Sequence, residues 1–169
     1  MVTNGNATNG NGAAQANSPE FSIQRIYIKD LSVECPSSPQ VFRQEWKPNI
    51  DLQINIDTEK LEDDYYQVIL KITVVAKNSD KIALLVETQE AGIFMLRNFT
   101  PEQRHQMLGA FCPNVLFPYV REIISETAVR AGFPPLYLSP VNFDAIYAEQ
   151  LRKQQKDQGN EPAGSGVVV

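Results

Sequence analysis

The stretch NIDLQINID, Asn49 to Asp57, alternates polar and apolar residues without interruption. Its even-numbered positions are isoleucine or leucine, and its odd-numbered positions are asparagine, aspartate or glutamine. Because successive side chains of a β-strand point to opposite faces, this period of two predicts a strand with one buried and one solvated face. The stretch therefore predicts an antiparallel sheet with one face packed on a core.

The same period continues along the chain. After the turn-forming residues 58–64, a second alternating segment runs from Tyr65 to Lys77, and its apolar face is longer. The segment Asn78-Ser79-Asp80 is rich in turn formers and predicts a hairpin into a further strand, Ile82 to Glu90. Three consecutive strands with short links predict an antiparallel meander.

The segment 22–35 predicts another strand, but its apolar residues change from even to odd positions. A β-bulge at 28–30 would restore one continuous apolar face. Beyond this bulge Asp30 and Glu34 share the polar face. The apolar face there would carry Leu31, Val33 and Cys35.

The second half of the chain changes to helical signals. Thr100, a first-turn proline and Gln103 predict a capped helix over 101–111. Pro113 and Pro118 predict a break, with a second helix from Asn114, as N-cap, to Arg130. A last helix is predicted over 140–155. Strands followed by helices predict an α+β fold, a four-stranded antiparallel sheet with helices packed on one face.

Composition limits the partners. The chain has 169 residues, a net charge of −5 and a pI near 4.9, which argues against nucleic acid as a partner. No apolar run approaches the length that spans a bilayer, so we expect a cytoplasmic protein without direct membrane insertion. We expect a disordered N-terminal tail over 1–19, one folded domain over 20–155 and a flexible C-terminal tail over 156–169, because both ends lack apolar periodicity.

Catalytic chemistry is not evident in the sequence. Residues four apart on a strand lie about 13 Å from one another, so Asp30 and Glu34 cannot act across one bond. His105 and Cys112 are about 10 Å apart along a helix, which is too far for a nucleophile and its base. Two cysteines and one histidine do not supply a zinc site, and we expect buried free thiols. We predict a protein that is not an enzyme and that has no metal or cofactor.

Apolar residues occur on both faces of the predicted strands. Ile69 and Val75 lie opposite the main apolar face of their strand. This surplus favours an oligomer or a binding groove. Residues outside the regular strands could line such a groove or could complete the core: Phe42, Trp46, Phe143 and Tyr147.

Three segments together resemble one family. They are IQRIYIKDLSVECPSSP at 23–39, CPNVLFPYVRE at 112–122 and FPPLYLSPVNFDAIYAEQ at 133–150. In these motifs and their order the chain resembles SecB, the bacterial protein-export chaperone family. The likeness includes the segment EAGIF at 90–94, which it implies to be a turn. The resemblance implies a homotetramer, a dimer of dimers, that holds precursor proteins unfolded without ATP and delivers them to the SecA motor.

The resemblance also implies two sites. The client groove would lie between the sheet and the last helix, on Phe42, Trp46, Ile50, Leu52, Ile54, Phe143 and Tyr147. The SecA dock would be an acidic patch on the exposed sheet face, on Asp30, Glu34, Leu85 and Glu87, and any zinc would belong to SecA. Val86, Thr88 and Glu90 depart from residues common in relatives, at positions that influence oligomer packing.

Two alternatives stay open at this point. A chaperone of the same fold could serve a toxin–antitoxin system instead of export. A hydrolase using Cys112 and His105 is a third reading, and it predicts turnover that Cys112→Ala abolishes.

Overall fold

The computed structural model describes residues 18–158. Four strands precede three α-helices, with a short 3₁₀ turn at Gln40–Arg43 and a π-helical turn at Met107–Phe111. The elements are β1 (Glu20–Glu34), β2 (Asn49–Glu62), β3 (Tyr65–Asn78), β4 (Lys81–Arg97), α1 (Pro101–Gln106), α2 (Cys112–Arg130) and α3 (Phe143–Gln158).

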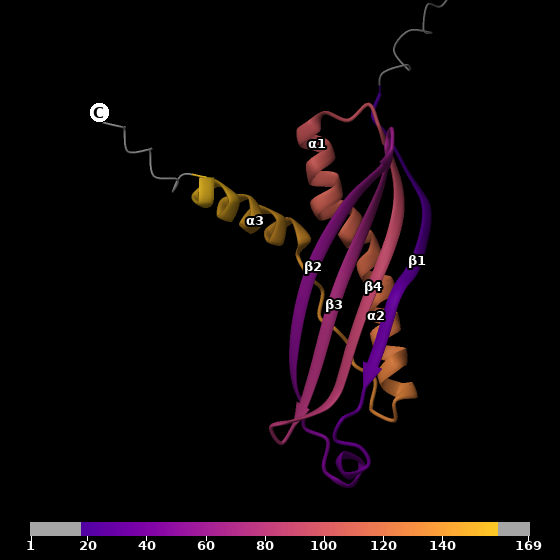
Figure 1. The fold of residues 1–169 in the computed structure, drawn as a ribbon, viewed down its shortest axis with the longest axis vertical. Coiled ribbons are helices and arrows are strands. Elements are labelled where there is room, and N and C mark those ends of the chain that lie inside the picture. Colours follow the sequence, from indigo (N-terminus) through magenta and orange to yellow (C-terminus); the bar gives the residue numbers. More distant parts are fainter. Residues whose placement is uncertain (1–17, 159–169) are drawn as a thin grey trace, which may run out of the picture.

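The four strands form one antiparallel sheet in the order β1-β4-β3-β2. The predicted α+β fold is confirmed, and the predicted meander comprises β2, β3 and β4. β1 does not lie beside β2, because the long connection 35–48 carries the chain across the end of the sheet (Figure 1). β1 and β2 are therefore the two edges of the sheet.

The predicted bulge in β1 is confirmed. The pairing of β1 with β4 shifts register between Ile28 and Asp30, and again between Ile23 and Arg25. Each extra residue exchanges the two faces of the strand, which explains the phase change in the sequence.

The long helix departs from the prediction. The capping box at Thr100 and Gln103 is present, but α1, the π-helical turn and α2 form one helical segment from Pro101 to Arg130, so the predicted break is wrong. Asn114 lies inside α2 and is not an N-cap. Pro113 has no N–H to donate, and the wider turn just before it accommodates the missing bond without ending the helix.

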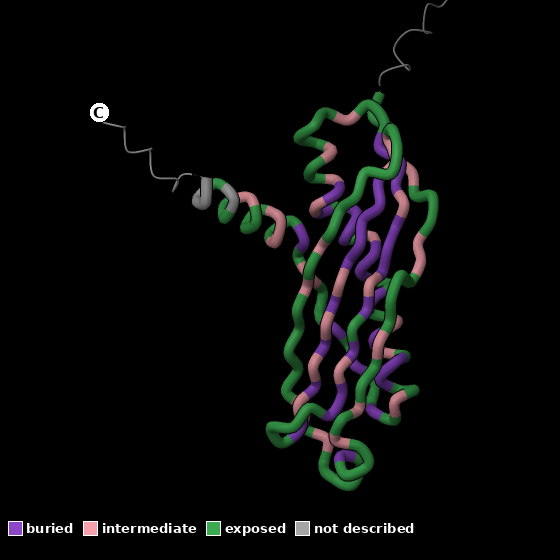
Figure 2. Tube along the Cα trace, viewed as in Figure 1, coloured by how far each residue is buried: buried purple, intermediate pink, exposed green. Residues whose placement is uncertain are grey.

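The core lies between the long helix and one face of the sheet, as Figures 1 and 2 show. Its largest fully buried side chains include Phe94, Leu116 and Ile124, from β4 and α2. Gly92 permits a close approach, since a Cβ there would lie 2.5 Å from the Phe94 ring. β4 continues through this glycine to Arg97, so the predicted turn at 90–94 is wrong.

The chain after α2 stays extended. Gly132, with φ +90°, follows the end of the helix, and no regular structure forms over 134–142. α3 starts at Phe143, later than predicted, and the Asn142 side chain accepts a hydrogen bond from the backbone N–H of Ala145 at 3.0 Å. Prolines at 134, 135 and 140 explain the later start, because each restricts the residue before it to extended backbone.

The predicted tails fall largely outside the described residues. Of the N-terminal tail over 1–19 the structure describes only residues 18 and 19, and of the C-terminal tail over 156–169 it describes only the end of α3, to Gln158. None of the helices within residues 18–158 is long and apolar enough to cross a membrane.

Candidate functional site

Three hollows follow one another from the 35–48 connection to α1, and the second and third of them are lined by residues of β2. They matter because β2 is a sheet edge, and the sequence predicts a groove against it. Their cavity volumes are about 130, 440 and 240 Å³ in that order. We call them the aromatic hollow, the middle hollow and the helix hollow.

The aromatic hollow is formed by rings. The ring centroids of Phe42 and Phe133 are 5.1 Å apart, and those of Trp46 and Phe133 are 4.9 Å apart. The Phe42 side chain stays half exposed, so the cluster presents an aromatic face to solvent. The structure thus brings together two predicted groove residues, Phe42 and Trp46, around Phe133, which was not among the predicted site residues.

The middle hollow lies between β2 and the extended segment 134–142. Ile50 and Leu52 line one wall, and both remain 38% exposed. The opposite wall, which the sequence analysis did not assign to a site, is made by Leu136, Tyr137, Leu138, Ser139, Pro140 and Val141. This wall could have been predicted from the sequence FPPLYLSPV, in which prolines favour extended backbone and the other residues are mostly apolar.

Both walls of the middle hollow have free backbone groups. β2 pairs with β3 alone, so its outer row of N–H and C=O groups has no strand partner among the described residues. Residues 134–141 make no hydrogen bond with another backbone group among the described residues. An extended chain placed here could bond to main chain and bury apolar side chains at once.

The remaining predicted groove residues lie deeper or further along. Ile54 is half-buried against the core, and Phe143 is only 2% exposed, packed edge-on against Phe117 at 5.5 Å. Phe143 therefore anchors α3 and does not line an open surface. Tyr147 lies in the helix hollow, beside His105 and Gly109.

The acidic residues gather on the other face of the sheet. In the β1–β4 register Glu34 lies opposite Leu85, Ser32 opposite Glu87 and Asp30 opposite Gln89. The Ser32 hydroxyl donates to the Glu87 carboxylate at 3.4 Å. The four residues predicted for the dock, Asp30, Glu34, Leu85 and Glu87, are therefore neighbours.

Charge on that face is uneven. On the β2 side, Lys71 pairs with Asp57 and Lys77 pairs with Asp51, the latter at 3.1 Å. On the β1 side, Asp30, Glu34 and Glu87 form no ion pair within residues 18–158. The negative potential on the outer face is therefore concentrated over β1 and β4.

The apolar face of β1 is on the helix side, as predicted, but it is incompletely covered. Leu31 and Val33 are each 41% exposed, since α2 makes most of its sheet contacts with β4 and β3. Cys35, just beyond them, is half-buried against the core. This leaves an apolar strip beside the sheet edge.

The cysteine and histidine do not form a catalytic pair. Cys112 is fully buried, and burial raises the pKa of its thiol to about 12. His105 Nδ1 lies 2.5 Å from the Tyr147 hydroxyl and makes no contact with Cys112. No group of three potential metal ligands occurs in the described part of the chain.

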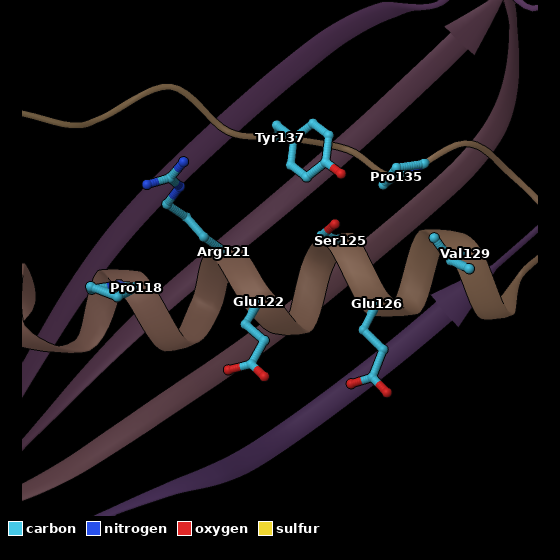
Figure 3. A pocket seen from close by; sticks show the side chains of 8 residues that line it. All are labelled: Pro118, Arg121, Glu122, Ser125, Glu126, Val129, Pro135 and Tyr137. Atoms are coloured by element: carbon cyan, nitrogen blue, oxygen red, sulfur yellow. The ribbon is translucent and has the colours of Figure 1, made fainter.

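A cavity larger than these three hollows, about 630 Å³, lies elsewhere, between α2 and the extended segment (Figure 3). Arg121 and Ser125 point toward the segment that carries Tyr137, whereas Glu122 and Glu126 point away from it. No predicted site residue lines this cavity, and its walls mix proline with charged side chains.

The fold and its hollows define a class: a four-stranded sheet backed by one long helix, with apolar hollows along a free sheet edge. The family model described as "Preprotein translocase subunit SecB" matches residues 14–154. The chain belongs to the SecB family. It is 50% identical over 149 residues to the protein-export protein SecB of Pseudomonas putida, covering 88% of this chain and 92% of that one.

Further relatives agree. The protein-export protein SecB of Hahella chejuensis is 52% identical over 140 residues, covering 83% of this chain and 88% of that one. Among solved structures, a SecB-like chaperone of Mycobacterium tuberculosis in complex with an antitoxin peptide matches with a TM-score of 0.61 at 16% identity. That match covers 72% of this chain and 90% of the other, and it shows the shared fold.

Proposed function

We propose that this protein is a cytoplasmic, ATP-independent chaperone that holds precursor proteins unfolded and delivers them to the SecA translocation motor. Membership of the SecB family and identities near 50% to protein-export proteins support this role. The observation that carries it is the middle hollow, where the free edge of β2 faces the extended segment 134–142 across an apolar gap.

The chemistry of the hollow suits unfolded clients. Apolar burial has no directional requirement, and backbone hydrogen bonds are the same for every sequence. A gap that offers Ile50 and Leu52 beside unpaired main chain would therefore bind many extended segments with little selectivity. The aromatic hollow at Trp46 and Phe133 would receive larger side chains further along the client.

The proposed assembly is a homotetramer, arranged as a dimer of dimers. The uncovered strip on β1 supports it, because Leu31 and Val33 lie half exposed beside unpaired backbone of a sheet edge. Phe111 and Tyr119 on the long helix are each 45% exposed. Self-association would cover both sets.

The proposed SecA dock is the acidic patch formed by Asp30, Glu34, Leu85 and Glu87. These acids form no ion pair with any described residue, so a basic partner would meet uncompensated charge. Such complementarity raises the rate of association and selects against acidic partners.

Export is favoured over service to a toxin–antitoxin system. The relatives named as protein-export proteins are about three times as similar in sequence as the antitoxin-bound chaperone, which shares the fold at 16% identity. A pull-down with SecA separates the two roles, since only the exporter needs that contact.

The test is a holding assay with the full chain and a chemically unfolded, slowly refolding precursor. We expect refolding to be delayed at stoichiometric tetramer without ATP, and the held precursor to pass to SecA. Native mass spectrometry of the same sample reports the assembly. A monomer that leaves the refolding rate unchanged would contradict the proposal.

A further inference from the structure

The structure assigns a latch to the contact between α3 and the π-helical turn, and we infer that it sets how long a client segment the groove accepts. Two side chains and one glycine form it: Tyr147 of α3, His105 of α1 and Gly109 of the turn. The inference rests on the proposed client groove and adds a determinant of its length.

The latch has a steric part. A Cβ at Gly109 would lie 2.6 Å from Tyr147 Cδ2 and 2.8 Å from its Cε2. The Tyr147 ring therefore rests directly on the backbone of the turn, where an alanine would have no room. π-helical turns rarely occur without a local reason, and this one presents its glycine to α3.

The latch also has a polar part. The Tyr147 hydroxyl and His105 Nδ1 are 2.5 Å apart, and the two ring centroids are 5.4 Å apart. The His105 side chain is exposed, so this bond contributes little to the core and can open without unfolding it. It holds the ring on the glycine.

The latch can affect client length because it lies at the far end of the groove. The helix hollow, about 240 Å³, lies between Ile56 and Thr58 of β2 and the latch, with Tyr147 as part of its wall. It follows the middle hollow along the same edge strand. A short client would occupy Ile50 and Leu52, whereas a longer one would reach the helix hollow and meet α3.

Figure 1 shows why α3 can yield. The helix projects away from the sheet, and only its first turns lie near the rest of the molecule. Phe143, buried against Phe117, fixes the start of α3, so motion would hinge there. Tyr147, one turn later, is the next point of attachment.

The energetic consequence is a difference between short and long clients. If a long client binds only the open state, its apparent affinity is reduced by the fraction of molecules that are open. Removing one hydrogen bond of ordinary strength would raise that fraction about two- to tenfold. A short client that ends at Ile54 is indifferent to the latch.

The experiment measures binding of two fluorescein-labelled apolar peptides, of six and twelve residues, to full-length wild type and variants. At about 3.3 Å per residue, six residues cover the middle hollow and twelve also reach the helix hollow. We expect His105→Ala to tighten binding of the twelve-residue peptide about two- to tenfold and to leave the six-residue peptide unchanged. His105→Gln, whose side-chain oxygen can accept the hydroxyl proton, should behave as wild type.

Two further measurements keep the test decisive. Gln106→Ala, an exposed neighbour on α1, is the matched control and should change neither affinity. Hydrogen exchange of the α3 amides should accelerate in His105→Ala and in Gly109→Ala. The latch would be overturned if His105→Ala bound each peptide with the same affinity as wild type and if hydrogen exchange of its α3 amides were unchanged. Failure of wild type to bind either peptide would instead overturn the proposed function.

Discussion

β2 and β1 form the two edges of the sheet, and each carries apolar side chains on the helix side and acids on the outer side. On β2 the apolar residues face the extended segment 134–142, and two acids, Asp51 and Asp57, pair with lysines of β3. On β1, Leu31 and Val33 remain 41% exposed, and Asp30 and Glu34 form no ion pair with a described residue. The same alternation of polar and apolar residues therefore gives β2 a neutral edge beside a groove and gives β1 a charged edge that is incompletely covered.

The difference comes from the neighbouring strand. β3 places Lys71 and Lys77 beside β2, whereas β4 places Leu85, Glu87 and Gln89 beside β1. Whether the acids of a strand are free or neutralised therefore depends on the neighbouring strand in the sheet. The sequence of the strand itself does not identify that neighbour. This separates a surface suited to uncharged, extended clients from one suited to a basic partner.

The largest expected effect is on the grooved edge. Leu52→Asp should weaken binding of an extended apolar peptide on the order of 100-fold, or about 2.7 kcal/mol, because a bound client would partly desolvate an unpaired carboxylate. Fluorescence anisotropy of a labelled peptide measures it. Leu61→Asp on the same strand, 46% exposed and away from the three hollows, is the control and should bind as wild type. Equal loss in both variants would contradict the groove assignment.

A smaller effect is expected on the charged edge. Asp30→Ala with Glu34→Ala should weaken SecA binding about tenfold at low salt, and the deficit should shrink as salt rises. The paired acids offer a matched control: Asp51→Ala with Asp57→Ala removes the same charge from the same face and should change SecA affinity less than twofold. A titration of SecA onto each variant decides it. Similar losses in both double variants would mean that net charge, not this patch, governs binding.

The smallest effect concerns Glu90 on β4, on the helix side opposite Ile28. This carboxyl is 3% exposed, its Oε2 has no partner among the described residues, and burial raises its pKa above the usual 4.5. The folded state therefore binds the proton more tightly, so this group's contribution to stability is complete below about pH 4.5 and is lost as pH rises through the raised value.

Glu90→Gln should accordingly raise the free energy of unfolding at pH 7 by about 1 kcal/mol and change it little at pH 4. Urea unfolding at the two pH values measures this. Gln89→Glu, a carboxyl on the outer face next in sequence, provides the contrast and should not show the same pH dependence. A gain from Glu90→Gln that is larger at pH 4 would contradict the assignment.

Much of this structure follows from local sequence. The alternation in 49–57 and 65–77, the turn at Asn78-Ser79-Asp80 and the bulge near Asp30 were all predictable, because each depends on residues within a few positions of one another. The acidic face was predictable in the same way, once the bulge gave Asp30 and Glu34 one orientation.

The predictions were wrong where contacts between residues distant in the sequence decide the local structure. Pro113 and Pro118 predicted a break, yet the helix continues through a π-helical turn packed on the sheet and on Tyr147. The resemblance implied a turn at EAGIF, yet the segment lies within β4, and Gly92 packs against the Phe94 ring. Tertiary contacts decided the structure in both cases.

The sequence by itself determined the strands, their polar and apolar faces, the capped start of the long helix and the family. Side-chain period and turn chemistry act over a few residues, so the sequence contains them directly. Only the tertiary structure decided which strands are edges, that the segment 134–142 forms the second wall of the groove, and which acids are neutralised. Those features join residues between 14 positions apart, as for Asp57 and Lys71, and about 90 positions apart, as for Ile50 and Val141, and their energies depend on what each side chain meets across the sheet.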